Sequence, residues 1–227
     1  MSQPSEPPSI YQLRITLREI SPLIWRRLLV CSDTTLAQLH AILQIVFDWS
    51  DEHLHTFHLH GKDYGSSGAD TRHVQLHTLR LRQGERFRYV YDYGAQWQCD
   101  IHLEARLPRD AKRFYPVCIA AKRAAPPEEC GGAWAYMARL DQHRYHPPFE
   151  AMFVAADAAR ALLDADAHAS VRDAVREAIG DLDVLQEAVD CLEAYQQFQP
   201  EHVDRRAINA QLQAWPWQRG DERGDEQ

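Results

Sequence analysis

The sequence contains no apolar run close to the ~18 residues that a membrane-spanning helix needs. Its opening residues, MSQPSEPPS, have neither the basic start nor the apolar stretch of a secretory signal peptide. These two absences exclude an ordinary helical membrane protein. They favour a cytoplasmic protein with no membrane contact.

Cysteine is also scarce, with 5 thiols scattered along 227 residues. None of them forms a CxxC pair, which excludes the spacing of a zinc ribbon or zinc finger. An odd, dispersed set in a chain of this size does not suit a disulfide framework, so we expect reduced thiols. The cysteines are Cys31, Cys99, Cys118, Cys130 and Cys191.

Positive charge is sparse in the second part of the chain. Residues 1–125 carry 16 Lys and Arg against 13 Asp and Glu, whereas residues 126–227 carry 9 against 20. Because nucleic-acid phosphates require a basic surface, the acidic part is a poor candidate for binding them. The first part has only a slight positive excess for that purpose.

With 45% hydrophobic and 26% charged residues, the chain can bury a core as one large domain or as a domain with an appendage. We predict an α+β domain over residues 9–148 and a C-terminal helical region over residues 149–215 that packs on it. Residues 1–8 and 217–227 are expected to be disordered.

Alternating apolar and polar residues predict a strand at residues 11–17, and a branched and aromatic run predicts a second at 23–30. Thr35 and Gln38 suit a helix-capping box, and apolar residues at helical spacing fill residues 36–49. Together with the later strands, this order predicts a β-grasp-like mixed sheet packed on one helix, then an irregular Pro/Gly loop and a helical layer. The later strands are expected at residues 54–60, 74–81, 87–93 and 97–103, the last two as a hairpin.

Apolar residues from Val171 to Leu192 follow alternating steps of four and three residues. Such a seam suits a coiled-coil dimer or an intramolecular helical layer. Because it covers fewer than four heptads and contains Gly180, we favour the intramolecular layer. Residues 150–197 could also present a surface to a protein partner.

Residues 126–132, PPEECGG, place two prolines, two carboxylates, a thiol and two glycines side by side. Proline fixes φ and glycine permits positive φ, so the segment predicts a shaped loop that presents acidic and sulfur groups. Ordinary packing rarely needs that mixture, which makes the segment a candidate site.

Six ordered motifs are spread along the chain. They are PLIWRR (22–27), the helix 36–49 with Leu39-His40, HLHTF (53–57), YDYG (91–94) with Trp97, YPVC (115–118) followed by PPEECGG, and PEHVD (200–204) with Ile208-Asn209 and Leu212. Through them the chain resembles the plasmid pRiA4b ORF-3-like family, a bacterial and archaeal group often labelled as transposon-passenger or TnpR-like proteins. The resemblance implies an α+β fold and an association with mobile elements, but little biochemistry.

The sequence departs from this family's pattern at several positions. Ala125 stands where the family usually has a cysteine, and Ala95 and Gln96 stand where it usually has acidic residues. Glu129 and Gln199 stand where aspartate is usual. These departures imply a divergent or inactive version of the family's chemistry.

His53 and His55 are candidate metal ligands. Two residues apart on a strand, both side chains would project from one face with Cα atoms about 6–7 Å apart, which suits a divalent metal. Alternatively, one ring stacks on Phe57 or Trp49 and the other bonds a backbone carbonyl.

Cys118 and Cys130, with Glu128 and Glu129 nearby, could complete a zinc site of mixed thiolate, imidazole and carboxylate ligands. Reduced, partly buried thiols are the alternative. No cofactor is established by these patterns, and a divalent metal is the candidate.

Asp92, Glu128 and Glu129 are the candidate catalytic carboxylates. Asp92 could act as a general base or metal ligand if it faces a cleft, or it could cap the turn that follows it. Tyr91 and Trp97 lie beside it in the sequence and join the candidate binding set.

Several arginines could form a basic patch for phosphate or for an acidic partner. Arginines on strands also commonly solvate an exposed face, and that alternative remains open. The candidates are Arg26, Arg27, Arg80, Arg82, Arg86 and Arg88.

We therefore predict a cytoplasmic accessory or binding protein with one polar site, formed where the HLHTF, YDYG and PPEECGG segments converge. Polar side chains of this kind do not serve an apolar core, and buried polar groups need partners. One alternative is a metal-dependent hydrolase, which could act on a phosphodiester with His53, His55, Asp92 and Glu128 around the ion. Another is a structural interaction module that uses the C-terminal helices.

Overall fold

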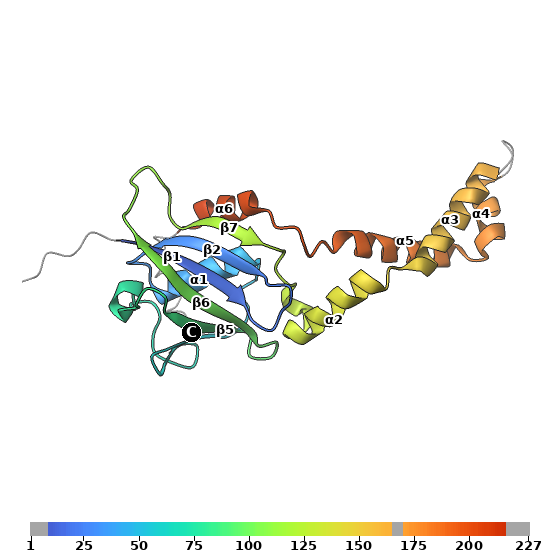
Figure 1. The fold of residues 1–227 in the computed structure, drawn as a ribbon. Helices are drawn as coiled ribbons and strands as arrows, with labels where there is room; N and C mark the ends of the chain where they lie inside the picture. The colour runs from blue at the N-terminus through green and yellow to red at the C-terminus, as the bar shows by residue number, and fades with distance from the viewer. Residues whose placement is uncertain (1–8, 165–169, 217–227) are drawn as a thin grey trace, which may run out of the picture. The chain divides into compact units, whose positions relative to one another are not determined.

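A computed structural model describes residues 9–164 and 170–216 of the chain (Figure 1). The end segments that were expected to be disordered, 1–8 and 217–227, lie outside the described residues. None of the helices in the described part is both long and apolar enough to cross a membrane.

The described chain divides into two compact units. One comprises the residues up to Met137 and those from Pro200 onward, and the other comprises Ala138–Gln199. The chain thus leaves the first unit and returns to it. The predicted packing of residues 149–215 on the α+β domain stays a prediction.

A seven-stranded sheet forms the first unit, in the order β4-β3-β5-β6-β1-β2-β7. The predicted α+β class is confirmed, and every pair of neighbouring strands is antiparallel where a mixed sheet was expected. The strands are β1 (Ile10–Leu17), β2 (Trp25–Cys31), β3 (His55–Leu59), β4 (Lys62–Gly65), β5 (Arg86–Tyr91), β6 (Trp97–Leu107) and β7 (Val117–Lys122).

Helix α1 (Leu36–Phe47) lies across one face of this sheet (Figure 1). The predicted capping box is confirmed: the Thr35 side chain accepts from the Gln38 N–H at 3.1 Å, and the Gln38 side chain accepts from the Thr35 N–H at 2.9 Å. The apolar stripe of α1 is buried against the inward side chains of the strands. Among the strand residues buried here are Leu13, Ile15, Leu28, Tyr89 and Ile101.

The strand predicted at residues 74–81 is wrong. The segment forms the short 3-10 helix η1 (Leu76–Leu79), and its strand-like contact is a single bridge between Thr35 and Gln75. Leu76 and Leu79 are buried three residues apart, which is the repeat of a 3-10 turn and not the alternation of a strand. The apolar run alone could not distinguish the two.

Helix α6 (Arg205–Ala214) covers the edge strand β7. The Asn209 side chain accepts from the Cys118 N–H at 2.8 Å and donates to the Cys118 carbonyl at 3.0 Å. One amide side chain therefore takes the place that a neighbouring strand would have. This contact blunts an edge that could otherwise pair with another chain.

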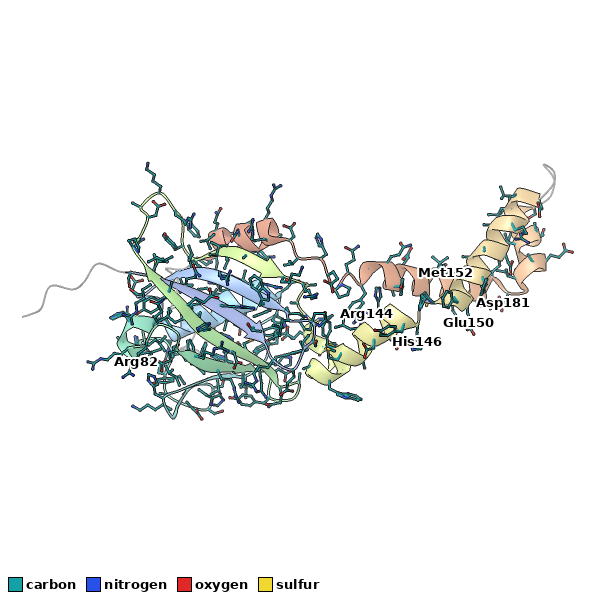
Figure 2. All side chains as sticks on the ribbon, viewed as in Figure 1. Arg82, Arg144, His146, Glu150, Met152 and Asp181 are labelled. Atoms are coloured by element: carbon teal, nitrogen blue, oxygen red, sulfur yellow. The ribbon has the colours of Figure 1, made fainter. Side chains whose placement is uncertain are left out.

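The second unit contains α3 (Phe149–Asp164), α4 (Val171–Ile179) and α5 (Leu182–Gln197), and α3 packs on both of the others. Gly180, at φ +81°, separates α4 from α5, so the predicted seam folds back within the chain as a helical layer. Helix α2 (Gly132–Tyr145) runs across the boundary between the units. Glu150, Met152 and Asp181 of the second unit are labelled in Figure 2.

Candidate functional site

Three segments that are distant in the sequence meet at one end of the sheet. Strands β3 and β5 pair antiparallel with His55 opposite Tyr91. His53, two residues before β3, therefore lies close to Asp92, which follows β5. Strands β5 and β6 pair with Tyr91 opposite Trp97. The strand register alone therefore brings the HLHTF and YDYG segments together.

Glu128, in the short 3-10 helix η2 (Glu128–Cys130), links the PPEECGG loop to both segments. One carboxylate oxygen accepts from the Ser50 N–H at 2.6 Å, and the other accepts from the Tyr91 hydroxyl. The Glu128 carbonyl accepts from Trp97 Nε1 at 3.3 Å. Only 9% of the Glu128 side chain is exposed, so the carboxylate is nearly buried and both of its oxygens have donors.

Burial, and then the hydrogen bond to Glu128, raises the pKa of Tyr91 well above its ordinary value. The phenol therefore stays protonated at neutral pH and acts as a donor. Tyr91 stacks on Trp49, with the ring centroids 5.0 Å apart, which fixes the orientation of its hydroxyl.

The PPEECGG loop also approaches the turn between β5 and β6 very closely. A Cβ atom at Gly132 would stand 2.3 Å from the Ala95 carbonyl oxygen, and Gly132 has φ +90°. Glycine is required there for both reasons.

The His53 ring lies among three carboxylates. Its Nε2 is 3.6 Å from Glu128 Oε1, 3.6 Å from Glu129 Oε1 and 4.0 Å from Asp92 Oδ2. About a third of the His53 side chain is exposed (34%), and Glu129 is 83% exposed, so the group opens to solvent on one side. We refer to His53, Tyr91, Asp92, Trp97, Glu128 and Glu129 as the Glu128 cluster.

Asp92 caps the turn that follows it, which is one of the two roles that its sequence position suggested; a role as general base or metal ligand stays a prediction. It has φ +54°, and its Oδ1 accepts from the Gly94 N–H at 2.8 Å, as a turn-capping aspartate does. Its carbonyl also accepts from the Gln96 N–H at 2.7 Å. The second oxygen, Oδ2, is the one that faces His53.

His55 has different neighbours from His53. Its ring stacks on His40 at a centroid distance of 3.6 Å and meets Phe57 edge-on at 5.9 Å. Its Nε2 is buried and has no hydrogen-bond partner among the residues that the structure describes. A joint role of His53 and His55 on one metal ion therefore stays a prediction.

The partner of His55 belongs to a second polar group, which the sequence analysis missed as a site. His40, on α1, bonds the Tyr89 hydroxyl through Nδ1 at 2.7 Å and Asp51 through Nε2 at 2.5 Å. Gln44 donates to the same hydroxyl at 2.9 Å and accepts from the Asp51 N–H at 3.2 Å. The available signal was a histidine and a glutamine on the buried stripe of a helix, where each needs a partner.

Burial, and then the charge of His40, lowers the pKa of His55 from 6.5 to about 4. Because the folded-state pKa is depressed, the unfolded chain binds more protons between these values, and stability falls as pH falls through the window. We expect His55 to remove about 2–3 kcal/mol from the free energy of unfolding between about pH 7 and pH 4.

Urea unfolding at a series of pH values measures this loss. A His55→Phe variant, which keeps a ring but cannot titrate, should have a flatter pH dependence. The control is His73→Phe, because 78% of the His73 side chain is exposed. Equal slopes in the two variants would contradict the assignment.

Cys118 and Cys130 lie on different elements. Cys118 is on β7, where its thiol donates to the Ala120 carbonyl at 3.5 Å and burial raises its pKa, whereas Cys130 is on η2. Within residues 9–164 and 170–216, no group of three or more His, Cys, Asp or Glu side chains is placed to hold a metal ion. The candidate metal ligands His53, His55, Cys118 and Cys130 are thus not gathered into one set.

Arg26 cannot contribute to the expected basic patch, because it is only 1% exposed. Its guanidinium donates to the carbonyls of Val46 at 2.8 Å, Lys122 at 3.2 Å and Arg123 at 2.9 Å. It also donates to the Trp25 carbonyl at 3.0 Å. A buried cation here ties together the end of α1, β2 and the chain after β7.

A family model described as plasmid pRiA4b ORF-3-like protein matches residues 9–167. The chain belongs to the plasmid pRiA4b ORF-3-like family. The match covers the whole sheet, the PPEECGG loop, α2 and α3. The 200–212 segment, which resembled the family's closing motif, lies outside the matched residues.

Two relatives of this pRiA4b ORF-3-like chain are similar over much of its length. The uncharacterised protein y4hQ of Sinorhizobium fredii (strain NBRC 101917 / NGR234) is 30% identical over 136 residues, which is 56% of this chain and 70% of y4hQ. The crystal structure of MM3350, a protein of unknown function from Methanosarcina mazei Go1, is 28% identical with a TM-score of 0.62, and covers 88% of this chain and 96% of its own. Neither description names an activity, so function has to be argued from the side chains.

The departures from the family pattern border the Glu128 cluster. Ala95 supplies the carbonyl that Gly132 approaches, and Gln96 has φ +55° and donates its side-chain amide to the Tyr93 carbonyl at 2.7 Å. Acidic side chains at these two positions would add negative charge to the same turn.

Proposed function

We propose that this pRiA4b ORF-3-like protein is an accessory or binding protein whose Glu128 cluster holds a compact cationic group, such as an amine or a guanidinium, of its ligand. The observation that carries the proposal is the half-exposed His53 ring with three carboxylates 3.6–4.0 Å away. A mobile-element setting is part of the proposal, and the plasmid in the family's name supports it.

The charge balance favours a cation. With a neutral imidazole, the carboxylates of Asp92, Glu128 and Glu129 carry three negative charges against no cationic side chain within the cluster. Hydrogen bonds between a charged donor and a carboxylate are the strong ones, and Arg-like groups can make two at once. Glu128 is already fixed by Ser50 and Tyr91, so the acceptors at the rim are held in place before a ligand arrives.

Argininamide is a suitable probe, because it presents a guanidinium and no carboxylate. We expect its addition to shift the His53 ring resonances in an NMR titration in a saturable way. Glu129→Gln should weaken this binding about threefold to tenfold, since it removes one exposed charged acceptor without changing the side-chain shape.

The matched control is Glu193→Gln, an equally conservative change of an exposed carboxylate on α5. It should bind the probe as the unmodified protein does. The proposal fails if the His53 resonances do not move, or if both variants lose binding equally, because the latter result would reflect net charge alone.

Two alternatives remain proposals. A metal-dependent hydrolase is supported by the imidazole of His53 beside Asp92 and Glu128, and metal analysis of the purified protein with a His53→Ala, His55→Ala variant tests it. An interaction module is supported by exposed apolar side chains on α3, where Phe153 is 67% exposed. Deletion of residues 150–197, with a check that the sheet still folds, tests the second.

A further inference from the structure

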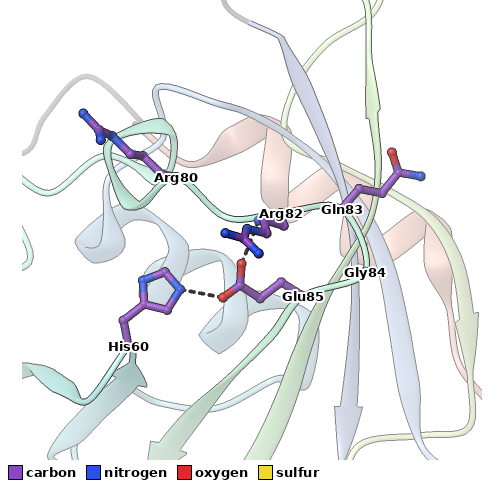
Figure 3. Close-up of a pocket in the computed structure, with 6 residues that line it drawn as sticks. All are labelled: His60, Arg80, Arg82, Gln83, Gly84 and Glu85. Carbon is purple, nitrogen blue, oxygen red and sulfur yellow. Dashed lines mark hydrogen bonds and ion pairs between the residues drawn. The ribbon is translucent and has the colours of Figure 1, made fainter.

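A separate pocket of about 520 Å³ lies beside the turns that flank β3 and β5, and it shares no residue with the Glu128 cluster. Its size is within the range of ~300–1,000 Å³ that is usual for small-molecule sites. Arg82 projects outward from the sheet unit (Figure 2). The lining residues are His60, Arg80, Arg82, Gln83, Gly84 and Glu85 (Figure 3).

The one carboxylate in this pocket is already engaged on both oxygens. Glu85 Oε1 bonds His60 Nε2 at 2.5 Å, and Oε2 accepts from the Arg82 N–H at 2.7 Å (Figure 3). The backbone N–H of Arg82, and then His60, hold the pKa of Glu85 below its ordinary value, so the carboxylate is charged at neutral pH. Glu85 therefore holds His60 and the backbone of Arg82 in place, and it makes no hydrogen bond to the guanidinium of Arg80 or Arg82.

The two arginine side chains are the pocket's uncommitted donors. Within the residues that the structure describes, neither the Arg80 nor the Arg82 guanidinium makes a hydrogen bond or an ion pair, and both residues are exposed. Figure 3 shows Arg82 next to Glu85, whereas the Arg80 side chain extends away from Glu85 and His60. An exposed guanidinium can donate several hydrogen bonds, so an anionic ligand with several acceptor oxygens suits this rim.

The backbone beneath these arginines is held firmly. Arg106 donates to the Leu81 carbonyl from β6, and the Gly84 N–H donates to the Leu103 carbonyl at 2.8 Å. Leu81, between the two arginines, is fully buried. The backbone around Arg82 is therefore attached to β6 at Leu81 and at Gly84. Little backbone entropy is lost there when a ligand binds.

We propose that the Arg80–Arg82 pocket binds the phosphate group of a small phosphomonoester. A phosphate dianion offers three oxygens that match the fork of a guanidinium. The pocket volume leaves room for the group that carries the phosphate. A nucleic-acid backbone offers phosphodiesters instead, each with one negative charge and two free oxygens, and the experiment separates the two kinds of ligand.

The test uses the full chain with three probes: adenosine monophosphate, adenosine, and a single-stranded thymidine oligonucleotide. In calorimetry the monophosphate should bind and adenosine should not. Arg80→Gln with Arg82→Gln should weaken monophosphate binding about tenfold or more, because two charged donors are lost. The control, Arg86→Gln with Arg88→Gln, removes the same charge from the exposed side of β5. It should change the affinity for the monophosphate by less than about twofold.

Backbone amide shifts provide a second readout on the unmodified protein. Adenosine monophosphate should move the resonances of Gln83 and Gly84 and leave those of Glu128 and Glu129 unchanged. This readout remains informative if the arginine variants fold poorly, and it separates this pocket from the Glu128 cluster.

Oligonucleotide binding that is lost only in the Arg80, Arg82 variant, without binding of the monophosphate, would overturn the monoester as the ligand in favour of a backbone phosphodiester. Oligonucleotide binding that falls equally in both variants and steeply with salt would overturn the pocket in favour of an extended basic surface. Absence of monophosphate binding, or equal loss of it in both variants, would also overturn the proposal.

Discussion

Replacing Glu128 with alanine is expected to lower the free energy of unfolding by about 3–5 kcal/mol. The substitution would leave the part-buried Tyr91 hydroxyl without its acceptor, and it would remove the acceptor of the Ser50 N–H, which belongs to an exposed residue. It would also release the PPEECGG loop from the end of the sheet. Chemical denaturation, monitored by the fluorescence of the neighbouring tryptophans, measures the loss.

The adjacent residue provides the matched control. Glu129 has the same side chain on the same 3-10 turn, but it is 83% exposed. Glu129→Ala should change the free energy of unfolding by no more than about 0.5 kcal/mol. Similar losses for the two substitutions would show that Glu128 is not the residue that links the segments.

Arg26→Ala is the second substitution with a large expected effect, about 3–5 kcal/mol of unfolding free energy. It would leave a cavity beside Phe47 and four carbonyl oxygens without their donor, including those of Val46 and Arg123. Burial lowers the pKa of Arg26 to about 10, which shows that the site is costly for a charge, yet the guanidinium is still charged at neutral pH.

Arg27→Ala is the control for the neighbouring position. Arg27 is half-exposed and pairs with Glu104 at 2.6 Å and 2.8 Å, so its loss should cost about 1 kcal/mol. Arg26→Lys should recover little of the loss, because an ammonium cannot reach four separate carbonyls. Thermal and urea unfolding of the three variants measure these losses. A larger loss of unfolding free energy for Arg27→Ala than for Arg26→Ala would contradict the account.

The parts of the fold that the sequence predicted are those with a strong local signal. The capping box of Thr35 and Gln38 and the hairpin around Gly94 depend on residues close in the chain, and both were assigned correctly. The 74–81 segment was misassigned because a short apolar run does not by itself distinguish a strand from a helical turn such as η1. The antiparallel order of all seven strands depends on pairing between distant segments, which no local pattern carries.

For the candidate site, too, some features could be predicted from the sequence and others depended on contacts between distant segments. The sequence predicted that three segments would meet, because their polar side chains had no other evident partner. The hydrogen bonds of Glu128 reach Ser50, Tyr91 and Trp97, and His53 Nε2 lies 3.6 Å from its carboxylate. It did not distinguish His53 from His55, since strand alternation places both on one face but says nothing about α1 above them. Arg26 was assigned to a basic patch for a related reason: the four carbonyls that hold it in the interior lie on separate stretches of the chain.

A double-mutant cycle between Tyr91→Phe and Glu128→Gln tests most directly whether the YDYG segment and the PPEECGG loop are joined through Glu128. Because the Tyr91 hydroxyl donates to the Glu128 carboxylate in a nearly buried site, the two changes should be coupled by about 1–2 kcal/mol of unfolding free energy. Additive effects, with a coupling below about 0.3 kcal/mol, would mean that the loop and the sheet do not meet at this pair.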